Sequence, residues 1–426
     1  CKKIFQQGGN MNEGSENARK NIENFNKGRK SMEEKEVKKC GTFASRIRMM
    51  FGGLIMFMLT LLPINQAHAS KEEMYILLNL LVQKGVITAE ESKEMLAAVE
   101  NITKKQKEDA AKNSIKTSAA ENIKIGGYIQ GRYDSYDFSG KNDEFSLKRT
   151  RIGLSGKVID NVSFKIEFDA LKGKDNDLLT DAWIKMSYLP QFNITVGQFK
   201  LPFSEEYNIS SSALDTIERS LPVNNLATEY DKGIMIDGNF IGGKIYYGVS
   251  LTNGTGGNKS DDNDNKDVTG RIVFAPWEGS ENVASGLKFG YGYQSGKQGT
   301  GANEKDRTRN DFMLKYQYKN LRMLAEYIGQ EEKNTSTTKK NGYFVQCAYN
   351  VPLNNGKSIE PVVKYEVYDP NTKVSKNTQT IFTAGFNLYL NKLTKLSTNY
   401  RWRNDDQGGN IASNKNELFT QLQIKF

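Results

Sequence analysis

Histidine and cysteine are almost absent from this chain of 426 residues, which contains one His and three Cys. The single histidine, His68, lies in a segment that we expect to be removed. The remainder therefore lacks the imidazole that Ser-His-Asp catalysis, Cys-His catalysis and imidazole metal sites require. Cys1 and Cys40 lie upstream of the same cut, which leaves Cys347 without a partner for an intramolecular disulfide. We predict no catalytic residues, no metal site and no cofactor.

A long hydrophobic run and a strong charge imbalance are also missing. Outside the N-terminal region there is no run of 18 or more apolar residues, which excludes an ordinary spanning helix there. The formal charge is +9, of which residues 1–69 contribute +6 (12 Lys or Arg against 6 Asp or Glu), leaving +3 for the rest. Positive and negative charges are nearly balanced after residue 69, and this gives no support for nucleic-acid binding, which needs a basic face or stripe.

The first 69 residues divide into two parts. Residues 1–48 are polar and without periodicity, which predicts a disordered extension or a wrongly assigned start. Two arginines then precede the apolar run Phe51–Leu62, and Ala67-His-Ala69 follows it. This order of charged, apolar and small-x-small segments is typical of a secretory signal peptide, here residues 49–69 with a cut after Ala69. A membrane-anchor helix is the alternative.

Residues 70–121 have helical spacing. Met74, Leu77, Leu78 and Leu81 form a helical stripe, and Thr88-Ala-Glu-Glu91 is a capping box. We predict a helical hairpin or coiled-coil segment followed by a linker. An apolar face this short needs a partner. The hairpin would therefore associate between chains, or pack on itself in the alternative.

From Asn122 to Phe426 the period changes to two. Ile125, Ile129 and Tyr133, for example, alternate with Tyr128, Gln130 and Arg132. A soluble sandwich also alternates, so the connections decide. About sixteen such segments occur, and every other connection is long and polar: Ser135–Glu144, Lys172–Asp177, Ser204–Asp231, Asn253–Lys266, Ser295–Arg307, Gln330–Lys340, Asp369–Asn377 and Asn404–Asn416.

Long polar loops that alternate with tight turns are typical of outer-membrane barrels, in which an even strand count puts both chain ends in the periplasm. Closure leaves no unpaired sheet edge in lipid. The fold class predicted for residues 122–426 is therefore all-β, a 16-stranded antiparallel transmembrane β-barrel. Aromatic residues near strand ends are predicted to form the interfacial girdles: Trp183, Tyr188, Phe240, Trp277, Tyr400 and Trp402.

Several stretches together resemble the phosphate-selective porin O/P family of bacterial outer membranes. They are Phe145-Ser-Leu-Lys-Arg-Thr-Arg-Ile-Gly-Leu-Ser-Gly156, Asp181–Pro190, Val196–Phe203 and Glu218-Arg-Ser-Leu-Pro222, with Lys84–Glu91 as a helical preface. The resemblance implies a sixteen-stranded homotrimeric porin in the outer-membrane lipid, with a constriction loop, here Ser204–Asp231, in each pore. It also implies passage of small anions, because Arg and Lys in the bore replace part of an anion's hydration.

The alternation of side chains predicts which Arg and Lys residues line the pore. With Ile152, Leu154 and Val158 facing lipid, Arg149 and Arg151 face inward. The residues predicted to line the pore and to set anion selectivity are Arg132, Arg149, Arg151, Lys165, Lys185, Lys200 and Arg219. The same parity also places Lys157, Lys244, Arg271, Lys364, Arg401 and Arg403 inward. The loop between Lys200 and Lys232 carries six carboxylates, which would repel phosphate unless they are paired or turned aside.

The predicted function is an outer-membrane porin, not an enzyme, for passive diffusion of small hydrophilic solutes and ions. An anion or phosphate preference is the finer expectation. The first alternative is a structural tether that uses the N-terminal helices to hold the cell wall or an envelope protein. The second is an outer-membrane hydrolase. The lack of histidine after residue 68 argues against the usual lipases, although an Asp-based site stays open.

Overall fold

The computed structural model describes residues 90, 93, 121–171, 178–405 and 415–426. The chain divides into two units, Cys1–Gln66 and Ala67–Phe426, and the first lies wholly outside the described residues. The predictions for residues 1–48, for the signal peptide and for the helical hairpin therefore fall outside the described part, except at Glu90 and Lys93, which are both helical. None of the helices in the described ranges is long and apolar enough to cross a membrane.

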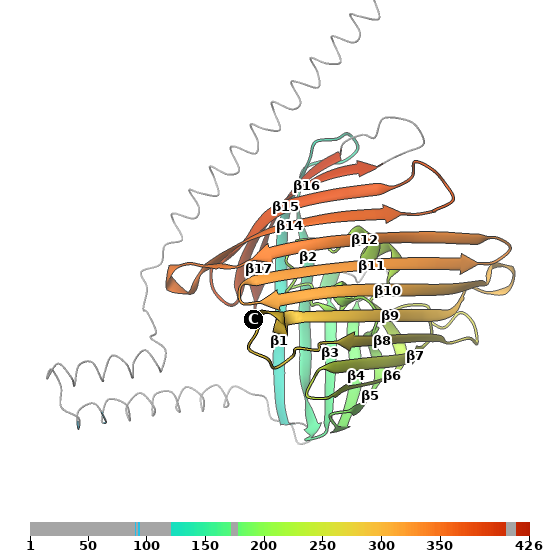
Figure 1. Cartoon of the computed structure of the whole chain (residues 1–426), viewed down its shortest axis with the longest axis horizontal. Helices are drawn as coiled ribbons and strands as arrows, with labels where there is room; N and C mark the ends of the chain where they lie inside the picture. Colours follow the sequence, from blue (N-terminus) through green and yellow to red (C-terminus); the bar gives the residue numbers. More distant parts are fainter. Residues whose placement is uncertain (1–89, 91–92, 94–120, 172–177, 406–414) are drawn as a thin grey trace, which may run out of the picture. The chain divides into compact units, whose positions relative to one another are not determined.

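Sixteen long strands form one antiparallel sheet, in which each strand pairs with its neighbours in sequence (Figure 1). Pairing of the first strand with the last closes the sheet into a barrel, and Phe426 exchanges two backbone hydrogen bonds with Gly127 at this seam. The strands are β1 (Glu121–Tyr136), β2 (Glu144–Ile159), β3 (Val162–Asp169), β4 (Leu179–Leu189), β5 (Phe192–Lys200), β6 (Tyr230–Phe240), β7 (Ile245–Thr252), β8 (Asp267–Phe274), β9 (Leu287–Gln298), β10 (Lys305–Tyr318), β11 (Leu321–Lys333), β12 (Thr337–Tyr349), β14 (Ser358–Asp369), β15 (Gln379–Tyr389), β16 (Thr394–Asp405) and β17 (Lys415–Lys425). A two-residue strand, β13 (Val351–Pro352), continues β12.

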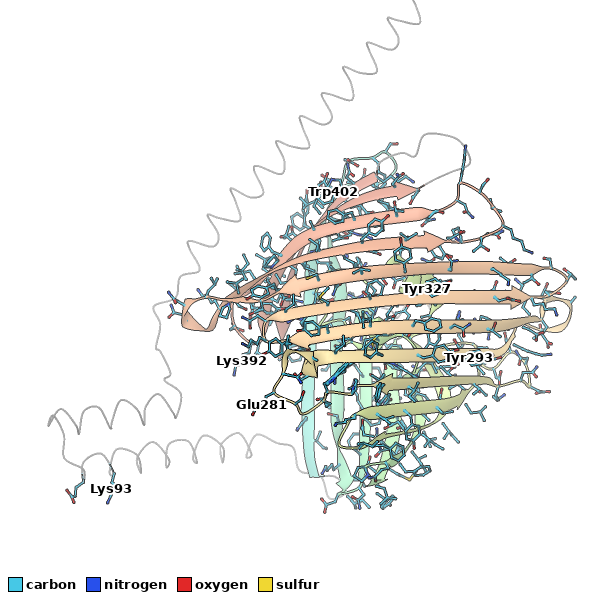
Figure 2. The ribbon with its side chains drawn as sticks, in the orientation of Figure 1. Lys93, Glu281, Tyr293, Tyr327, Lys392 and Trp402 are labelled. Carbon is cyan, nitrogen blue, oxygen red and sulfur yellow. The ribbon has the colours of Figure 1, made fainter. Side chains whose placement is uncertain are left out.

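Side chains alternate between the two faces of this barrel, as the period of two predicts. On β1, Ile125 and Ile129 are 52% and 43% exposed, whereas Gln130 is fully buried. The large apolar side chains on the outer face include the labelled Tyr293, Tyr327 and Trp402 (Figure 2). An exposed apolar face around a closed sheet is the arrangement that lipid requires, because closure leaves no open sheet edge with unpaired N–H and C=O groups.

The connections differ from the prediction at two places. Ser295–Arg307 and Gln330–Lys340 are mostly strand, because β9 continues to Gln298 and β11 to Lys333. These segments are polar yet keep the ladder of their hairpins, as in the pairs Lys305↔Gln298 and Lys333↔Thr337. Polarity therefore did not mark the ends of these strands. Strands that extend beyond the lipid have no need of apolar side chains.

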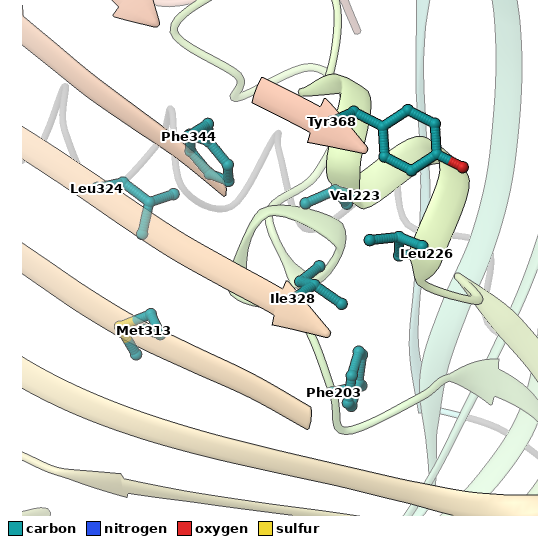
Figure 3. Close-up of a cluster of buried hydrophobic side chains, with 8 residues drawn as sticks. All are labelled: Phe203, Val223, Leu226, Met313, Leu324, Ile328, Phe344 and Tyr368. Carbon is teal, nitrogen blue, oxygen red and sulfur yellow. The ribbon is translucent and has the colours of Figure 1, made fainter. Parts of the chain in front are cut away.

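The long connection between β5 and β6, residues 201–229, lies inside the barrel, and we call it the inner loop. It contains two short helices, α4 (Glu205–Asn208) and α5 (Leu221–Leu226). Its Phe203, Val223 and Leu226 are buried in one apolar cluster with side chains of the wall (Figure 3). The wall side of this cluster consists of Met313 on β10, Leu324 and Ile328 on β11, Phe344 on β12 and Tyr368 on β14.

This cluster fixes which side of the barrel the inner loop occupies. Each fully buried apolar side chain of this size contributes roughly 1.5–3 kcal/mol. The loop is therefore held against the β10–β14 wall, and the prediction of a loop folded into the bore agrees with the described structure.

Candidate functional site: the passage beside the inner loop

The carboxylates of the inner loop point toward the wall and are paired there. Glu205 contacts Arg271 on β8 and Lys315 on β10, the latter at 2.7 Å. Asp215 lies 2.6 Å from Arg322 on β11. Further pairs join Glu206 to Lys364 on β14, at 3.8 Å, and Glu218 to both Arg132 on β1 and Lys148 on β2. These pairs turn four loop carboxylates toward the wall.

The pKa values of these loop carboxylates depend on the balance between burial and the charges of neighbouring cations. Burial alone would raise the pKa of Glu205, but the charges of Arg271 and Lys315 overcome it and lower that pKa to about 2. The pKa of Glu218 is likewise lowered, against its burial, by Lys148 and Arg132. Burial dominates at Glu206, where it raises the pKa despite the charge of Lys364. Glu205 and Glu218 therefore stay ionised, and so attached, at neutral pH.

Hydrogen bonds to the loop backbone extend the attachment around the wall. The Ser204 hydroxyl and the Glu206 N–H both donate to Glu326 on β11, each at 2.7 Å. Lys395 on β16 donates to the Leu214 carbonyl at 2.8 Å. The Tyr128 hydroxyl on β1 lies 2.6 Å from that of Ser211. The loop is thus fixed to β1, β8, β10–β12 and β14–β17, while Lys148 on β2 and Lys200 on β5 contact it from the remaining wall.

A cavity of about 360 Å³ lies on that other side, between the β2–β6 wall and Asn208 and Ser210 of the inner loop. Four cations and two carboxylates line it: Arg151, Lys165, Lys185 and Lys200, with Glu167 and Asp181. Trp183, Thr195, Phe199, Tyr230 and Met235 complete the lining from β4, β5 and β6. Among the residues that line the cavity, cations outnumber carboxylates, and they lie beside an aromatic surface.

Each of the four cavity cations also has a carboxylate partner. Arg151 lies 3.1 Å from Asp169, and Lys185 lies 2.8 Å from Asp237. Lys165 lies 2.7 Å from Asp181. Such pairing holds the side chains in place and reduces the field that an ion in the cavity meets. Any preference for anions that depends on these cations is therefore expected to be moderate.

Lys200, the last residue of β5, and Arg219, on the inner loop, both lie 3.2 Å from Glu229 at the end of that loop. Burial would raise the pKa of Glu229, but Arg219 and Lys200 lower it. Arg149 differs from these cations. Its guanidinium donates to Gln130 at 3.0 Å, and the described part of the chain shows no ion pair of Arg149 within 4 Å. It is therefore a lumen cation without a direct carboxylate partner there, although the charge of Glu218 acts on it.

The structure separates the seven predicted selectivity residues into groups. Arg151, Lys165, Lys185 and Lys200 come together around the cavity. Arg219 lies on the inner loop at Glu229. Arg132 is buried and held by Asp134 and Glu218, so it anchors the loop instead of lining the cavity. Their effect on selectivity stays a prediction.

Lys244 lies in the turn between β6 and β7, where its N–H donates to the Ile241 carbonyl, and its inward orientation stays a prediction. One assignment from the sequence is wrong. Trp183 lines the cavity instead of joining the lipid-facing girdle, and its indole N–H donates to Asp181 at 3.2 Å. The signal was present: Trp183 is two residues from the inward Lys185 and next to Ile184, which is 54% exposed.

Lys148 was missed because a β-bulge interrupts the parity of β2. Gln130 pairs with Arg149, but the next residue, Gly131, pairs with Leu147, so that Lys148 has no partner in the ladder. Lys148 consequently faces inward with Arg149 and lies 2.9 Å from Glu218. A break in phase marks the bulge in the sequence, since the exposed Leu147 is odd-numbered and the exposed Ile152 is even-numbered.

Comparisons with known proteins agree with this architecture. Residues 123–320 match the family model for phosphate-selective porin O and P, which confirms the resemblance predicted from the motifs. An uncharacterized protein of Aquifex aeolicus is 26% identical over 440 residues, covering 87% of this chain and 99% of that protein.

Among solved structures, an anion-selective porin from Comamonas acidovorans matches with a TM-score of 0.55 and 14% identity, covering 71% of this chain and 99% of that one. The outer-membrane protein OmpT of Vibrio cholerae, in its trimer form, matches with a TM-score of 0.51 and 9% identity, covering 71% and 99%. At these identities the matches support the closed barrel fold alone.

Proposed function

We propose that this chain, an outer-membrane β-barrel related to phosphate-selective porin O and P, is a passive channel that favours anions. The coarser statement, a porin-type channel of the outer membrane, follows from the family match and from the closed barrel with its apolar exterior. The preference for anions, and phosphate as one of them, is the part that needs a test.

One observation carries the anion preference: the loop carboxylates are paired with cations. Glu205, Asp215 and Glu218 are paired with cations of the wall on the side where the loop is docked, and Glu229, beside the cavity, is paired with Lys200 and Arg219. Arg151, Lys165, Lys185 and Lys200 line the free side with only Glu167 and Asp181 among them. A ring or row of cations beside a narrow passage raises the local concentration of anions.

Reversal potentials in a salt gradient test this proposal. The purified barrel is reconstituted in a planar bilayer with a tenfold KCl gradient, and the sign of the zero-current potential reports the preferred ion. We expect an anion-directed potential that shifts toward cations in Lys200→Glu and in Arg151→Glu. Lys392→Glu is the control, since Lys392 is exposed in the turn between β15 and β16 (Figure 2). A cation-directed potential in the unaltered protein would refute the preference.

We further propose a homotrimer. The outer face carries many exposed apolar side chains, which suit either lipid or a second copy, and the trimer form of OmpT shares this fold. Mass measurement of the detergent-solubilised barrel, corrected for bound detergent, tests the trimer. A mass equal to one chain would contradict it.

The tether hypothesis is a second proposal for residues 71–116. Deleting this segment and measuring both conductance and envelope attachment separates the two roles. Loss of attachment with normal conductance would support a tether, and unchanged attachment would exclude it.

A further inference from the structure

The cavity beside the inner loop contains two hydroxyl groups that have no hydrogen-bond partner among the described residues. The Thr195 side chain is 2% exposed and that of Tyr230 is 7% exposed, and both line the cavity. Neither hydroxyl oxygen finds a partner within the described protein. A buried polar group without a partner costs about 1–3 kcal/mol. Two such groups on one cavity are therefore a sign of a site that a polar molecule completes.

The strand register explains how the cavity wall is built. Lys185 on β4 pairs with Thr195 on β5, and Thr195 pairs with Met235 on β6, so the three lie in one row across the wall. All three line the cavity. A cation, a hydroxyl and an apolar side chain thus stand side by side on a rigid sheet, with adjacent strands about 4.8 Å apart.

Trp183 lies on the same face, two residues before Lys185 on β4. Its indole N–H is held by Asp181 at 3.2 Å, which fixes the ring against the wall. The Lys200 ammonium lies 5.6 Å from the centre of the Tyr230 ring, which places a cation close to the second hydroxyl. The cavity therefore offers an apolar surface from Trp183 and Met235 beside donors from Thr195 and Tyr230.

We propose that this cavity is a binding site for small organic carboxylates that have an apolar or aromatic body. The carboxylate accepts a hydrogen bond from one of the two hydroxyls, either Tyr230 beside Lys200 or Thr195 beside Lys185, which lie at opposite ends of the cavity. The apolar body contacts Trp183 and Met235. Because the lining offers four cations, each held in place by a carboxylate partner, the site favours an anion over a neutral sugar. This inference rests on the proposed channel function and specifies a solute class for it.

Inorganic phosphate is the competing solute, and the lining argues against it as the best ligand. Phosphate has no apolar surface, and the four cavity cations already contact carboxylates. A phosphate ion would have to displace those partners, as would any anion that relies on charge alone. A carboxylate with an apolar body gains in addition from contact with the indole.

Current block in planar bilayers tests the site, with benzoate, acetate and inorganic phosphate as the probes. Each probe is added to a channel that carries chloride current, and the concentration that halves the current is measured. We expect benzoate to halve the current at a concentration at least tenfold below that for acetate or phosphate. An equal effect of benzoate and acetate would overturn the apolar part of the site. A stronger effect of phosphate would overturn the choice of carboxylate.

Three variants locate the effect. Thr195→Val and Tyr230→Phe each remove one hydroxyl at nearly constant shape. The variant that removes the donor to the carboxylate raises the benzoate concentration about tenfold or more, as expected for a lost hydrogen bond to a charged group. Thr383→Val is the matched control, because Thr383 on β15 is 1% exposed and its hydroxyl also lacks a partner in the described protein, but it is remote from this cavity. Equal block of Thr195→Val, Tyr230→Phe and Thr383→Val would overturn the proposal.

The two proposals fail in different ways. Absence of any conductance from folded barrel, or a cation-directed reversal potential, contradicts the channel proposal. Normal anion-directed conductance without selective block by benzoate contradicts only the carboxylate site.

Discussion

Replacing Glu205 by Gln should release the inner loop from the wall while the barrel stays closed. Glu205 joins two cations of the wall, Arg271 on β8 and Lys315 on β10. Its side chain is 14% exposed, so solvent screens these pairs little. Gln keeps the size of the side chain but leaves both cations without their shared carboxylate.

The pKa of Glu205 gives the magnitude. It lies at about 2 instead of 4.5, and this difference corresponds to roughly 3 kcal/mol of interaction that the charged form makes only in the docked state. Breaking a buried pair by removing one partner costs a similar 3–5 kcal/mol or so. A loss of about 3 kcal/mol raises the population of undocked loop on the order of a hundredfold.

Cysteine labelling measures that population. Val223 is fully buried in the apolar cluster under the loop, so a thiol in Val223→Cys reacts with a maleimide only when the loop leaves the wall. Cys347 is replaced by Ser in a chain that begins after Ala69 and so lacks Cys1 and Cys40, which leaves residue 223 as the thiol being labelled. We expect labelling about a hundredfold faster when Glu205→Gln is added.

Glu417→Gln is the matched control for this experiment. Glu417 on β17 is buried and pairs with Arg401, but neither residue belongs to the inner loop. The control therefore removes a comparable lumen carboxylate without touching the attachment. Equal labelling rates in Glu205→Gln and Glu417→Gln would refute the reasoning.

The remaining predictions concern charge, pH and packing. Arg149→Gln should shift the reversal potential toward cations by a few millivolts. Its effect on stability should be small, because the change leaves no direct carboxylate partner in the described structure without its cation. An unchanged potential would show that Arg149 does not contribute to selectivity. The attachment through Glu205 is fully present above pH 4.5 and is lost as the pH falls toward about 2. Labelling of Val223→Cys, expressed relative to an exposed reference thiol because the thiolate fraction decreases with falling pH, should therefore rise over that interval when Glu205 is present and stay flat when Glu205→Gln is added. Ile328→Ala should cost about 2–5 kcal/mol of loop docking, since Ile328 is fully buried against the loop, and faster labelling at residue 223 would verify it.

The barrel itself was predictable because alternation is a local property of each strand. Residues 2 apart share a face whatever lies around them, so Ile125 and Gln130 could be assigned from neighbours alone. The long segment between β5 and β6 was also recognisable, since its polar and helical residues interrupt the period. Strand ends were less certain, as the polar but paired residues of β9 and β11 show.

The arrangement of the site depended on contacts that sequence spacing does not contain. Glu205 and Lys315 are 110 residues apart, and nothing local indicates that the loop docks against β10. A partial signal existed in Met313 and Phe344, which are apolar at inward positions where a water-filled bore would place polar residues. The bulge at Lys148 and the inward Trp183 are both detectable in the sequence from the phase of the inward and outward alternation along β2 and β4.

The one-sided docking of the inner loop has an evolutionary consequence. The apolar residues that anchor the loop and the residues that line the cavity lie on different parts of the barrel wall. A mutation in one group therefore need not disturb the other. Substitutions on β4, β5 and β6 can retune the solute while Phe203, Val223 and Leu226 continue to hold the constriction in position. Members of such a family could therefore diverge in what they admit and still share one architecture.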